Sequence, residues 1–241
     1  MVDTKTLLRA SLEASKDFMK APVAHDPGDS GDDAPAKVAP LIVPIRSLGE
    51  SHRERIAQHL LALEAHDRYL RFGYSATDEH IRRYIESLNF ERDEIFGIYN
   101  RKLELVAMAH LAFMGKDAEP CLESCAEFGV SVLKESRGLG LGSALFDRAA
   151  MHARNDGIQL MFIHALSEND VMLKIARNAG AKVEQLGSES EAYLRLTPPT
   201  LDSRLTEIVE EQVALVDYRL KVQAKQFWDF WAGVQGRNLT H

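Results

Sequence analysis

The chain has 241 residues, 45% of them hydrophobic and 27% charged, which is the ordinary composition of a soluble globular protein. That length suits one generous domain with extensions, or two small domains. A formal net charge of −7 argues against nonspecific binding to nucleic acid or to an anionic membrane, because both call for a basic face. The charge is compatible with a cationic substrate such as an amine.

The N-terminal residues and the cysteines indicate the compartment. The segment Met1–Lys5 lacks the basic and apolar regions of a signal peptide, and no apolar run approaches the roughly 18 residues of a membrane span. Only Cys121 and Cys125 occur, too few for a disulfide scaffold, and a zinc site would need further ligands at matching spacing. We expect a cytoplasmic protein with two reduced thiols, no metal and no membrane segment.

Two short regions precede the expected domain. Residues 1–20 carry Leu8, Leu12 and Phe18 at loosely helical spacing, which predicts an amphipathic helix. Residues 21–40 are rich in Pro, Gly and Asp and cannot bury enough apolar surface to become ordered. We therefore expect a flexible linker there.

Residues 41–196 mix strands and helices in one predicted domain. Pro44 suggests that the first strand lies at a sheet edge, and Asn100–Lys102 is a plausible hairpin turn. Ser75, with Asp78 three residues later, has the pattern of a capping box. The predicted strands cover residues 41–45, 95–99, 103–113, 124–133, 160–165, 182–185 and 192–196, and the predicted helices cover residues 51–72, 77–88, 140–155 and 169–178. This order indicates an α/β or α+β layer fold.

Residues 197–241 begin with an exit marked by Pro198 and Pro199 and then predict one long amphipathic helix. Its apolar stripe, interrupted by Gln223, consists of Leu205, Val209, Val213, Val216, Leu220, Phe227, Phe230 and Val234. We expect residues 203–235 to pack on the protein's own domain, to form a homodimer interface, or to dock a partner. Acidic residues on the polar side disfavour a membrane-surface helix, because anionic lipids would repel them.

The most informative segment is Val130–Ser143, in which an apolar strand enters a glycine-rich turn and an apolar-periodic helix leaves it. Gly138, Gly140 and Gly142 remove the Cβ atoms that would block a close approach, and they permit positive φ. The turn can therefore direct backbone N–H groups and the positive end of the helix at an anion, with Arg137 placed to help. The sequence thus describes a pyrophosphate cradle.

Three classes of ligand could use such a cradle. A Walker loop would need a lysine in the Gly142-Ser143-Ala144 segment, which has none. A dinucleotide fingerprint would need glycine in place of Ser143 and an acidic residue about 20 positions later. The third option fits best: Arg137-x-x-Gly140-x-Gly142 after a strand resembles the acetyl-CoA motif of the GNAT superfamily of N-acetyltransferases, whose loop binds the pyrophosphate of coenzyme A.

The resemblance continues on both sides of the loop and covers about two-thirds of the chain. Ala126–Val132 is similar to the family's fourth strand, whose parted backbone pairs with the pantetheine arm as an added strand would. Leu166–Asn169 is similar to the segment in which Asn169 would contact the pantetheine. Upstream, Asp67–Phe72 is similar to the branch that includes bacterial protein-lysine acetyltransferases.

The resemblance implies a mixed, mostly antiparallel central sheet flanked by helices, with acetyl-CoA as co-substrate and no metal. Extra helices would lie at both termini. The expected residues for binding coenzyme A are Val130, Val132, Arg137, Gly138, Leu139, Gly140, Leu141, Gly142, Ser143 and Asn169.

Transfer to an amine requires a deprotonated nitrogen, so a positioned carboxylate or histidine should accept a proton. Alternation along the fourth strand puts Glu127, Gly129 and Ser131 on one face, where the small residues leave space for a ligand. Glu127 is therefore the candidate catalytic base. A carboxylate here also matches the base of the protein-acetylating branch.

Other groups could accept the proton, and two positions depart from the family pattern. His110 and His164 lie on neighbouring predicted strands, although a lone strand histidine is more often packed in the core. Glu123 lies nearer the start of its strand. Many members of the family have a tyrosine where this chain has Ala176 and an aromatic residue where it has Ala181. Both departures bear on activity rather than on binding of coenzyme A.

The expected function is that of an N-acyltransferase that moves an acetyl group from acetyl-CoA to a protein lysine or a small amine in a ternary complex. The competing interpretation is a non-catalytic acyl-CoA-binding regulatory or adaptor module that docks a partner through its C-terminal helix.

Overall fold

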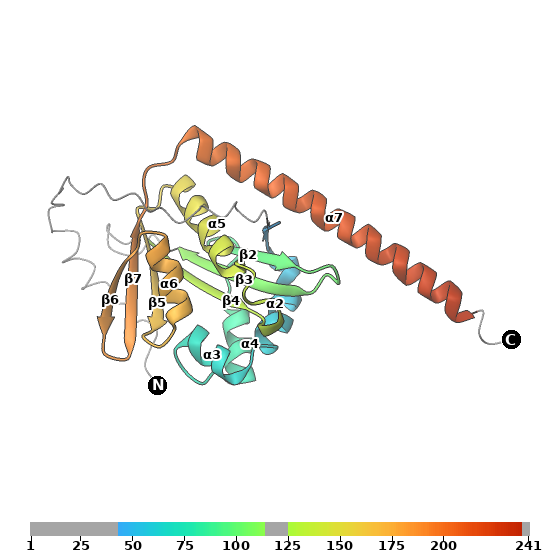
Figure 1. The fold of residues 1–241 in the computed structure, drawn as a ribbon, viewed down its shortest axis with the longest axis horizontal. Helices are drawn as coiled ribbons and strands as arrows, with labels where there is room; N and C mark the ends of the chain where they lie inside the picture. Colours follow the sequence, from blue (N-terminus) through green and yellow to red (C-terminus); the bar gives the residue numbers. More distant parts are fainter. Residues whose placement is uncertain (1–42, 114–124, 238–241) are drawn as a thin grey trace, which may run out of the picture. The chain divides into compact units, whose positions relative to one another are not determined.

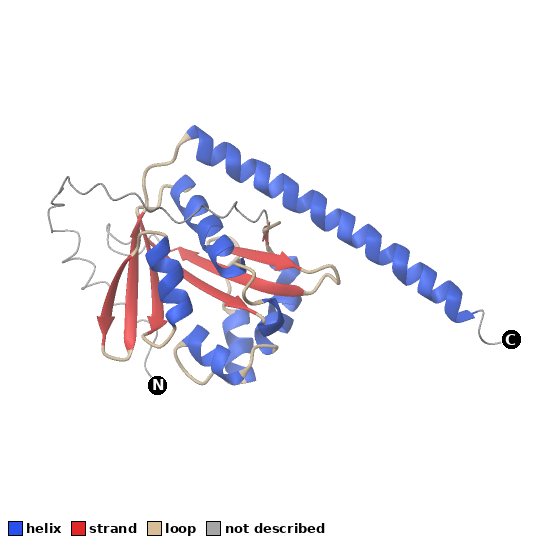
Figure 2. Cartoon of the chain, viewed as in Figure 1, coloured by secondary structure: helices blue, strands red, loops and turns tan. Residues whose placement is uncertain are grey.

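The computed structural model describes residues 43–113 and 125–237. The predicted N-terminal helix and linker, Cys121 and Glu123 lie outside these residues, whereas Cys125 lies within them and is buried. A seven-stranded sheet has the order β1-β2-β3-β4-β5-β7-β6 (Figure 1). Every pairing is antiparallel except that of β4 with β5. The predicted mixed, mostly antiparallel sheet flanked by helices is confirmed (Figure 2).

Most element bounds differ from the predicted ones by one to three residues. The strands are β1 (Arg46–Ser47), β2 (Glu94–Tyr99), β3 (Leu105–Phe113), β4 (Cys125–Val132), β5 (Leu160–Leu166), β6 (Lys182–Leu186) and β7 (Glu189–Arg195). The helices are α2 (Arg53–Leu61), α3 (Ala65–Phe72), α4 (Asp78–Glu86), α5 (Leu141–Asn155), α6 (Asp170–Asn178) and α7 (Leu201–Arg237), with 3₁₀ turns at Glu50–His52 and Lys134–Ser136.

The sheet has a hydrophobic core on each face. On one face, α5 and α6 cover the strands, and the Phe128 ring of β4 meets the Phe146 ring of α5 edge-on at 5.1 Å. On the other face, α2 and α4 bury Ile56 and Ile81 completely. Burying one such side chain contributes about 1.5–3 kcal/mol. The central strands β3 and β4 are therefore held from both sides, which fixes the position of the site described below.

The single helix predicted over residues 51–72 is wrong, because the chain breaks between α2 and α3. Glu64 has an extended backbone with ψ 159°. The Arg68 guanidinium donates to the carbonyl oxygens of Leu61 and Leu63 at 2.6 and 2.9 Å and pairs with Asp78 at 2.7 Å. The carbonyls freed at the end of α2 are thus satisfied. Apolar spacing could not predict the break, because it depends on contacts with α4.

Two predicted element starts are also wrong. Residues 43–45 have no regular structure, and β1 begins only at Arg46, because Pro44 has no N–H to offer a sheet ladder. Helix α4 is capped by Thr77 rather than Ser75, since the Thr77 hydroxyl accepts from the His80 N–H at 3.3 Å. The hairpin at Asn100 is confirmed: its side-chain oxygen accepts from the Lys102 N–H at 2.8 Å.

Helix α7 packs against α5 and β1 through its polar side. Ser203 Oγ donates to Asn155 Oδ1 at 2.7 Å, and Lys221 Nζ donates to the carbonyl oxygen of Tyr99 at 2.9 Å. The apolar stripe does not pack on the domain: its described members Leu205, Val209, Val213, Val216 and Leu220 are exposed. No helix in the described part of the chain is long and apolar enough to cross a membrane.

Candidate active site

The glycine turn between β4 and α5 is an open cradle. Gly138 and Gly140 have φ of +76° and +74°, a region that other residues enter only with strain. A Cβ atom built on either residue would meet no atom within 4 Å beyond those of its neighbours along the chain. The turn therefore has open space against its backbone at these two glycines.

The N-terminus of α5 differs from those of α4 and α6. The side chain of Thr77 caps α4, and the side-chain oxygen of Asn169 caps α6 by accepting from the Met172 N–H at 3.2 Å. At the start of α5, Gly140 provides no side-chain cap, and the first turn contains no acidic residue. Its N–H groups and the positive end of the helix dipole are therefore open to an anion.

Beside this turn, β4 and β5 separate from each other; they are the only parallel pair in the described sheet. The pairing of β4 with β5 ends at Glu127 and Phe162, although β4 continues to Val132. The Leu133 N–H donates to the Val106 carbonyl on β3 at 2.9 Å. Because N–H directions alternate along a strand, those of Val130 and Val132 face the side where β5 has moved away. These are the two strand residues that the sequence predicted for the pantetheine arm.

Arg137 and Asn169 have partners within the protein. Arg137 Nε donates to the Val132 carbonyl at 3.3 Å, and Arg137 Nη2 pairs with Asp67 on α3 at 2.5 Å. The Arg137 side chain nevertheless remains 45% exposed beside the glycine turn. Asn169 uses its oxygen to cap α6, which leaves the amide nitrogen as its donor. Both residues thus lie at the ends of elements that border the parted strands.

Glu127 lies at the point where β4 and β5 separate, and it is coupled to two residues. His164 on β5 places Nδ1 at 3.4 Å from Glu127 Oε1 and Nε2 at 3.3 Å from Glu191 Oε1 on β7. Burial alone would raise the pKa of Glu127, but the hydrogen bond and charge of His164, together with the charge of Arg71, hold that pKa below its ordinary value. Glu127 is therefore an ionised carboxylate at neutral pH.

The pKa of His164 is shifted in the opposite direction. Burial would lower the pKa of His164, but Glu127 and Glu191 on either side raise it above the ordinary value. His164 thus carries positive charge to a higher pH than a free imidazole. It is better suited to hold Glu127 in place than to accept a proton itself.

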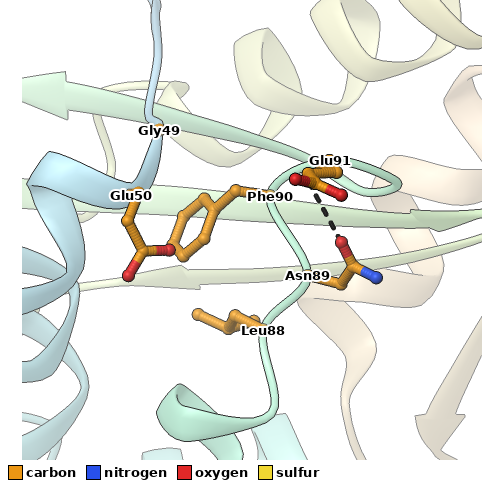
Figure 3. A pocket seen from close by; sticks show the side chains of 6 residues that line it. All are labelled: Gly49, Glu50, Leu88, Asn89, Phe90 and Glu91. Atoms are coloured by element: carbon orange, nitrogen blue, oxygen red, sulfur yellow. Dashed lines mark hydrogen bonds between the residues drawn. The ribbon is translucent and has the colours of Figure 1, made fainter.

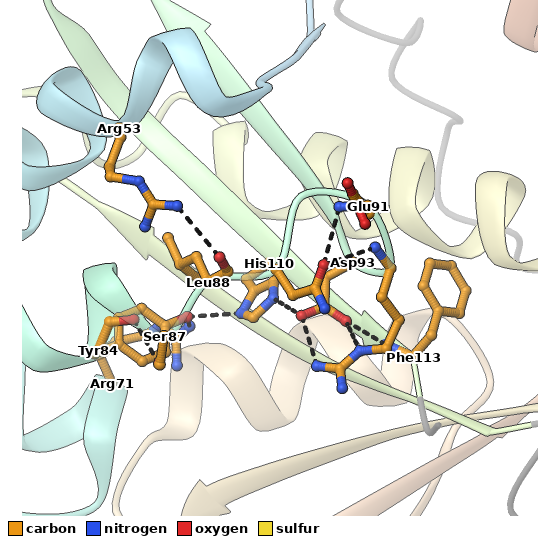
Figure 4. Close-up of polar contacts among 11 residues, drawn as sticks. Arg53, Arg71, Tyr84, Ser87, Leu88, Glu91, Asp93, His110 and Phe113 are labelled. Atoms are coloured by element: carbon orange, nitrogen blue, oxygen red, sulfur yellow. Dashed lines mark hydrogen bonds and ion pairs between the residues drawn. The ribbon is translucent and has the colours of Figure 1, made fainter. Parts of the chain in front are cut away.

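His110, the other candidate base, has both ring nitrogens engaged (Figure 4). Its Nδ1 accepts from the Tyr84 hydroxyl at 2.7 Å, and Nε2 donates to Asp93 Oδ2 at 3.3 Å. This tautomer is assigned from the partners, because Asp93 is a buried carboxylate that also pairs with Arg92 at 2.7 Å. Because both ring nitrogens are occupied, His110 is a poorer candidate base than Glu127.

The expectation that Gly129 and Ser131 leave space for a ligand is wrong for the described side chains. Ser131 Oγ bonds to His59 Nε2 at 2.8 Å, and burial lowers the pKa of His59 to about 4, so this pair is neutral. At Gly129, a Cβ would lie 2.6 Å from Cζ of Arg71. The space is filled by a guanidinium from α3. An isolated glycine within a strand is a signal of such a close approach.

Ala176 belongs to α6 and is completely buried where that helix packs on the core. This position therefore contributes no proton donor to the site. Ala181 packs partly buried against the same core.

A separate open depression lies elsewhere on the surface (Figure 3). Its lining comes from the segment after β1 and from the connection between α4 and β2, and it contains none of the predicted site residues. Glu50, one of its acidic groups, is already paired with Arg53 at 2.8 Å. The described residues contain no group of three or more His, Cys, Asp or Glu side chains that could hold a metal ion. We therefore place the candidate active site at the parted strands.

Comparisons with known proteins identify the family of this chain and structures with a similar fold. The model of the acetyltransferase (GNAT) family matches residues 59–181, more than half of the chain. The crystal structure of the GNAT domain of S. lividans PAT is similar with a TM-score of 0.54 at 20% identity, covering 68% of this chain and 100% of that one. An N-acetyltransferase from Staphylococcus aureus Mu50 gives a TM-score of 0.50 at 15% identity, covering 64% and 98%.

The chain therefore belongs to the acetyltransferase (GNAT) family. It is accordingly an N-acetyltransferase, and the two solved structures share its fold.

Proposed function

We propose that this enzyme transfers an acetyl group from acetyl-CoA directly to an amine, a protein lysine or a small amine, while both are bound. One observation carries the proposal: β4 turns the N–H groups of Val130 and Val132 toward the gap beside β5, immediately before an open glycine turn and an uncapped helix. An acyl-CoA needs this combination of an extended edge for amides and a cradle of N–H groups for phosphates.

The chemistry of coenzyme A fits the residues present. Residues 138–143 would hold the diphosphate, because the first turn of α5 contains no competing carboxylate. Arg137, which pairs with Asp67 but is 45% exposed, would add positive charge beside them. Val130 and Val132 would pair with the pantetheine amides, with Asn169 close to the same gap. When bound, acetyl-CoA supplies a thioester whose C–S bond breaks as the C–N bond forms.

Glu127 would receive the proton that the amine must lose. An ammonium cannot attack a carbonyl carbon, so its proton has to leave, and a fixed carboxylate at the acyl end can accept it directly or through one water. The Glu127 side chain is 39% exposed, which leaves it accessible from the acceptor side. His164 and Glu191 would keep its oxygen atoms oriented.

The test begins with binding of coenzyme A by the pure protein, measured by calorimetry. Gly140→Asp places a carboxylate in the anion cradle and should weaken binding roughly 10- to 100-fold, the equivalent of one or two charge-assisted hydrogen bonds. Gly157→Asp is the matched control, since Gly157 ends the same helix with φ +81° and equally open surroundings. Equal loss in both variants, or no heat with the wild type, would refute the proposed cofactor site.

Catalysis is then measured as thiol release from acetyl-CoA with a panel of amines and lysine-rich proteins. Glu127→Gln keeps the shape of the side chain but not its basicity, so kcat should fall about 10²- to 10⁴-fold while the affinity for coenzyme A is retained. A near-wild-type rate at every pH would remove Glu127 as the base.

A further inference from the structure

Two arginines on α3 have different surroundings. The guanidinium of Arg68 is fully engaged within the protein: it contacts three carbonyl oxygens and the carboxylate of Asp78. Arg71, one turn later, makes one hydrogen bond, from Nη2 to the Tyr84 hydroxyl at 3.1 Å. Within the described part of the chain, no carboxylate forms an ion pair with it. Most of its five N–H donors therefore remain available.

The guanidinium of Arg71 lies directly on β4. A Cβ at Gly129 would approach its Cζ, Nη1 and Nη2 to 2.6–2.7 Å, so only glycine admits this packing. Gly129 is two residues beyond Glu127, where the pairing of β4 with β5 ends. Arg71 therefore presents its charge on the same face of the strand as the candidate base.

A chain of hydrogen bonds also holds the guanidinium of Arg71 in place. Its partner Tyr84 donates to His110, and His110 donates to Asp93, which is 6% exposed and paired with Arg92 (Figure 4). The rings of Phe72 and Tyr84, which meet edge-on, pack beside the guanidinium with their centroids 5.3 and 5.7 Å from Cζ. A cation fixed in this way is prepared for a ligand, because little side-chain entropy remains to be lost on binding.

A positive charge here is unfavourable for a simple amine acceptor. It repels the incoming ammonium, and it lowers the basicity of Glu127. An acceptor with a carboxylate of its own would instead be attracted to Arg71, because a guanidinium binds a carboxylate through two parallel hydrogen bonds. The bound carboxylate would also offset the effect of the Arg71 charge on the basicity of Glu127.

We propose that Arg71 is the carboxylate-binding residue of the acceptor site, so that the acceptor is a free amino acid with its amine at Glu127 and its carboxylate on Arg71. This inference rests on the proposed function and narrows its acceptor class. A protein lysine, which has no carboxylate beside its reactive amine, is the alternative that the experiment separates.

The experiment compares free L-amino acids with their carboxamides in the acetyl-CoA thiol-release assay. The amide removes the carboxylate and leaves the reacting amine in place. We expect kcat/KM for the acids to exceed that for the amides about tenfold or more, because a site built for a charged group rejects the analogue without it. Lysine-containing peptides with blocked termini should be poorer acceptors than the free amino acids.

Three variants identify the residue responsible. Arg71→Met should bring the acid-to-amide ratio close to one, mainly through a raised KM for the acids. Gly129→Ala should lower the ratio too, because its methyl group displaces the guanidinium without removing the charge. Arg71→Lys should retain part of the preference. Arg82→Met, at a 60% exposed position on α4, is the control and should leave the ratio unchanged.

The outcomes separate this inference from the proposed function. Binding of coenzyme A by calorimetry, with amides or blocked peptides acetylated as well as the acids, would overturn the Arg71 proposal and leave the acetyltransferase proposal intact. The Arg71 proposal is equally overturned if Arg71→Met slows acids and amides to the same extent, since Arg71 would then act on structure or on transfer itself. Absence of coenzyme A binding would overturn both.

Discussion

At the scale of single residues, the site depends on one imidazole between two carboxylates. Glu127 and Glu191 belong to strands that flank β5 on opposite sides, and His164 on β5 contacts both. The charge of the histidine compensates for the burial of Glu127, which would otherwise favour the protonated carboxylic acid. A base in its neutral acid form cannot accept a proton, so in the proposed reaction His164 would keep Glu127 in its basic form at lower pH.

Replacing His164 should therefore move the acid limb of the pH–rate profile. In the wild type, protonation of Glu127 should lower kcat/KM only below pH 4.5, because the pKa of that carboxyl is lowered. His164→Gln removes the opposing charge while the burial remains, so the limb should shift to higher pH. The measurement is kcat/KM for the best acceptor across pH 4–8.

Glu191→Gln is the companion variant in this series. It retains the contact between His164 and Glu127, and the imidazole stays charged at the acid pH where Glu127 titrates. Its acid limb should therefore stay close to that of the wild type. An unchanged limb in His164→Gln would mean that Glu127 does not titrate in the reaction.

The residues of the site were not equally predictable from the sequence. The positive φ of the turn glycines and the face of β4 on which Glu127 lies both follow from local rules, since glycine spacing and strand alternation do not depend on distant contacts. Arg71 could not be found in this way, because its contact with Gly129 joins α3 to a strand 58 positions later. Only the isolated strand glycine gave a signal that something approaches closely.

At the scale of elements, α7 is attached by charge rather than by its apolar stripe. Glu207 accepts from His152 Nδ1 at 2.6 Å and pairs with Arg148 at 3.1 Å. Arg148 is almost completely buried against the ring of Phe96. Helical periodicity revealed the length of α7 correctly, but the choice of docking face depends on partners in α5 that the periodicity does not contain.

This attachment should depend on pH in both directions. Burial opposes the charged form of Glu207, but His152, Asn155 and Arg148 lower its pKa to about 2, so its contribution is present above pH 4.5 and is lost as the pH falls toward 2. Burial would lower the pKa of His152, yet Glu207 and nearby acids raise it above 6.5. Its contribution is complete below pH 6.5 and is lost as the pH rises through that raised pKa.

Glu207→Gln should consequently destabilise the protein most between about pH 4.5 and 6.5, by about 3 kcal/mol, because it leaves the buried Arg148 without its anion. Denaturant unfolding at pH 5.5 and 8.5 measures the loss, and limited proteolysis after β7 reports release of the helix. Glu211→Gln, on the same helix and without an ion pair among the described residues, is the control. Equal effects of the two changes would contradict the role of Glu207.

At the scale of the whole molecule, the order of strands and helices predicted the layered fold, but the separation of β4 from β5 was accessible only through the family resemblance. The separation is a property of pairing between strands that are distant in the chain, such as Cys125 with Leu160, and neither strand sequence encodes it by itself. The polar groups that line the gap come from α3, α4, β3, β5 and β7. An assembly from so many elements requires the complete fold.

The exposed stripe of α7 leads to a prediction about assembly. Val209, Val213, Val216 and Leu220 are spaced by four, three and four residues, the repeat of a coiled-coil seam. They lie on the side opposite the docked residues Ser203 and Ala214. A helix segment of this kind is self-complementary, so we expect two copies of the chain to pair along it with twofold symmetry.

Charge placed in that seam should separate the copies. Val209→Glu with Val216→Glu buries two carboxylates per chain in the expected interface and should convert a dimer into a monomer, measured by light scattering coupled to size exclusion. Lys225→Glu, at an exposed position that helical spacing puts on the opposite side of α7, should leave the mass unchanged. Affinity for coenzyme A should be equal in all three proteins, because the seam faces away from α5, whose N-terminus forms the cradle. A monomeric wild type would show that the stripe does not pair two copies.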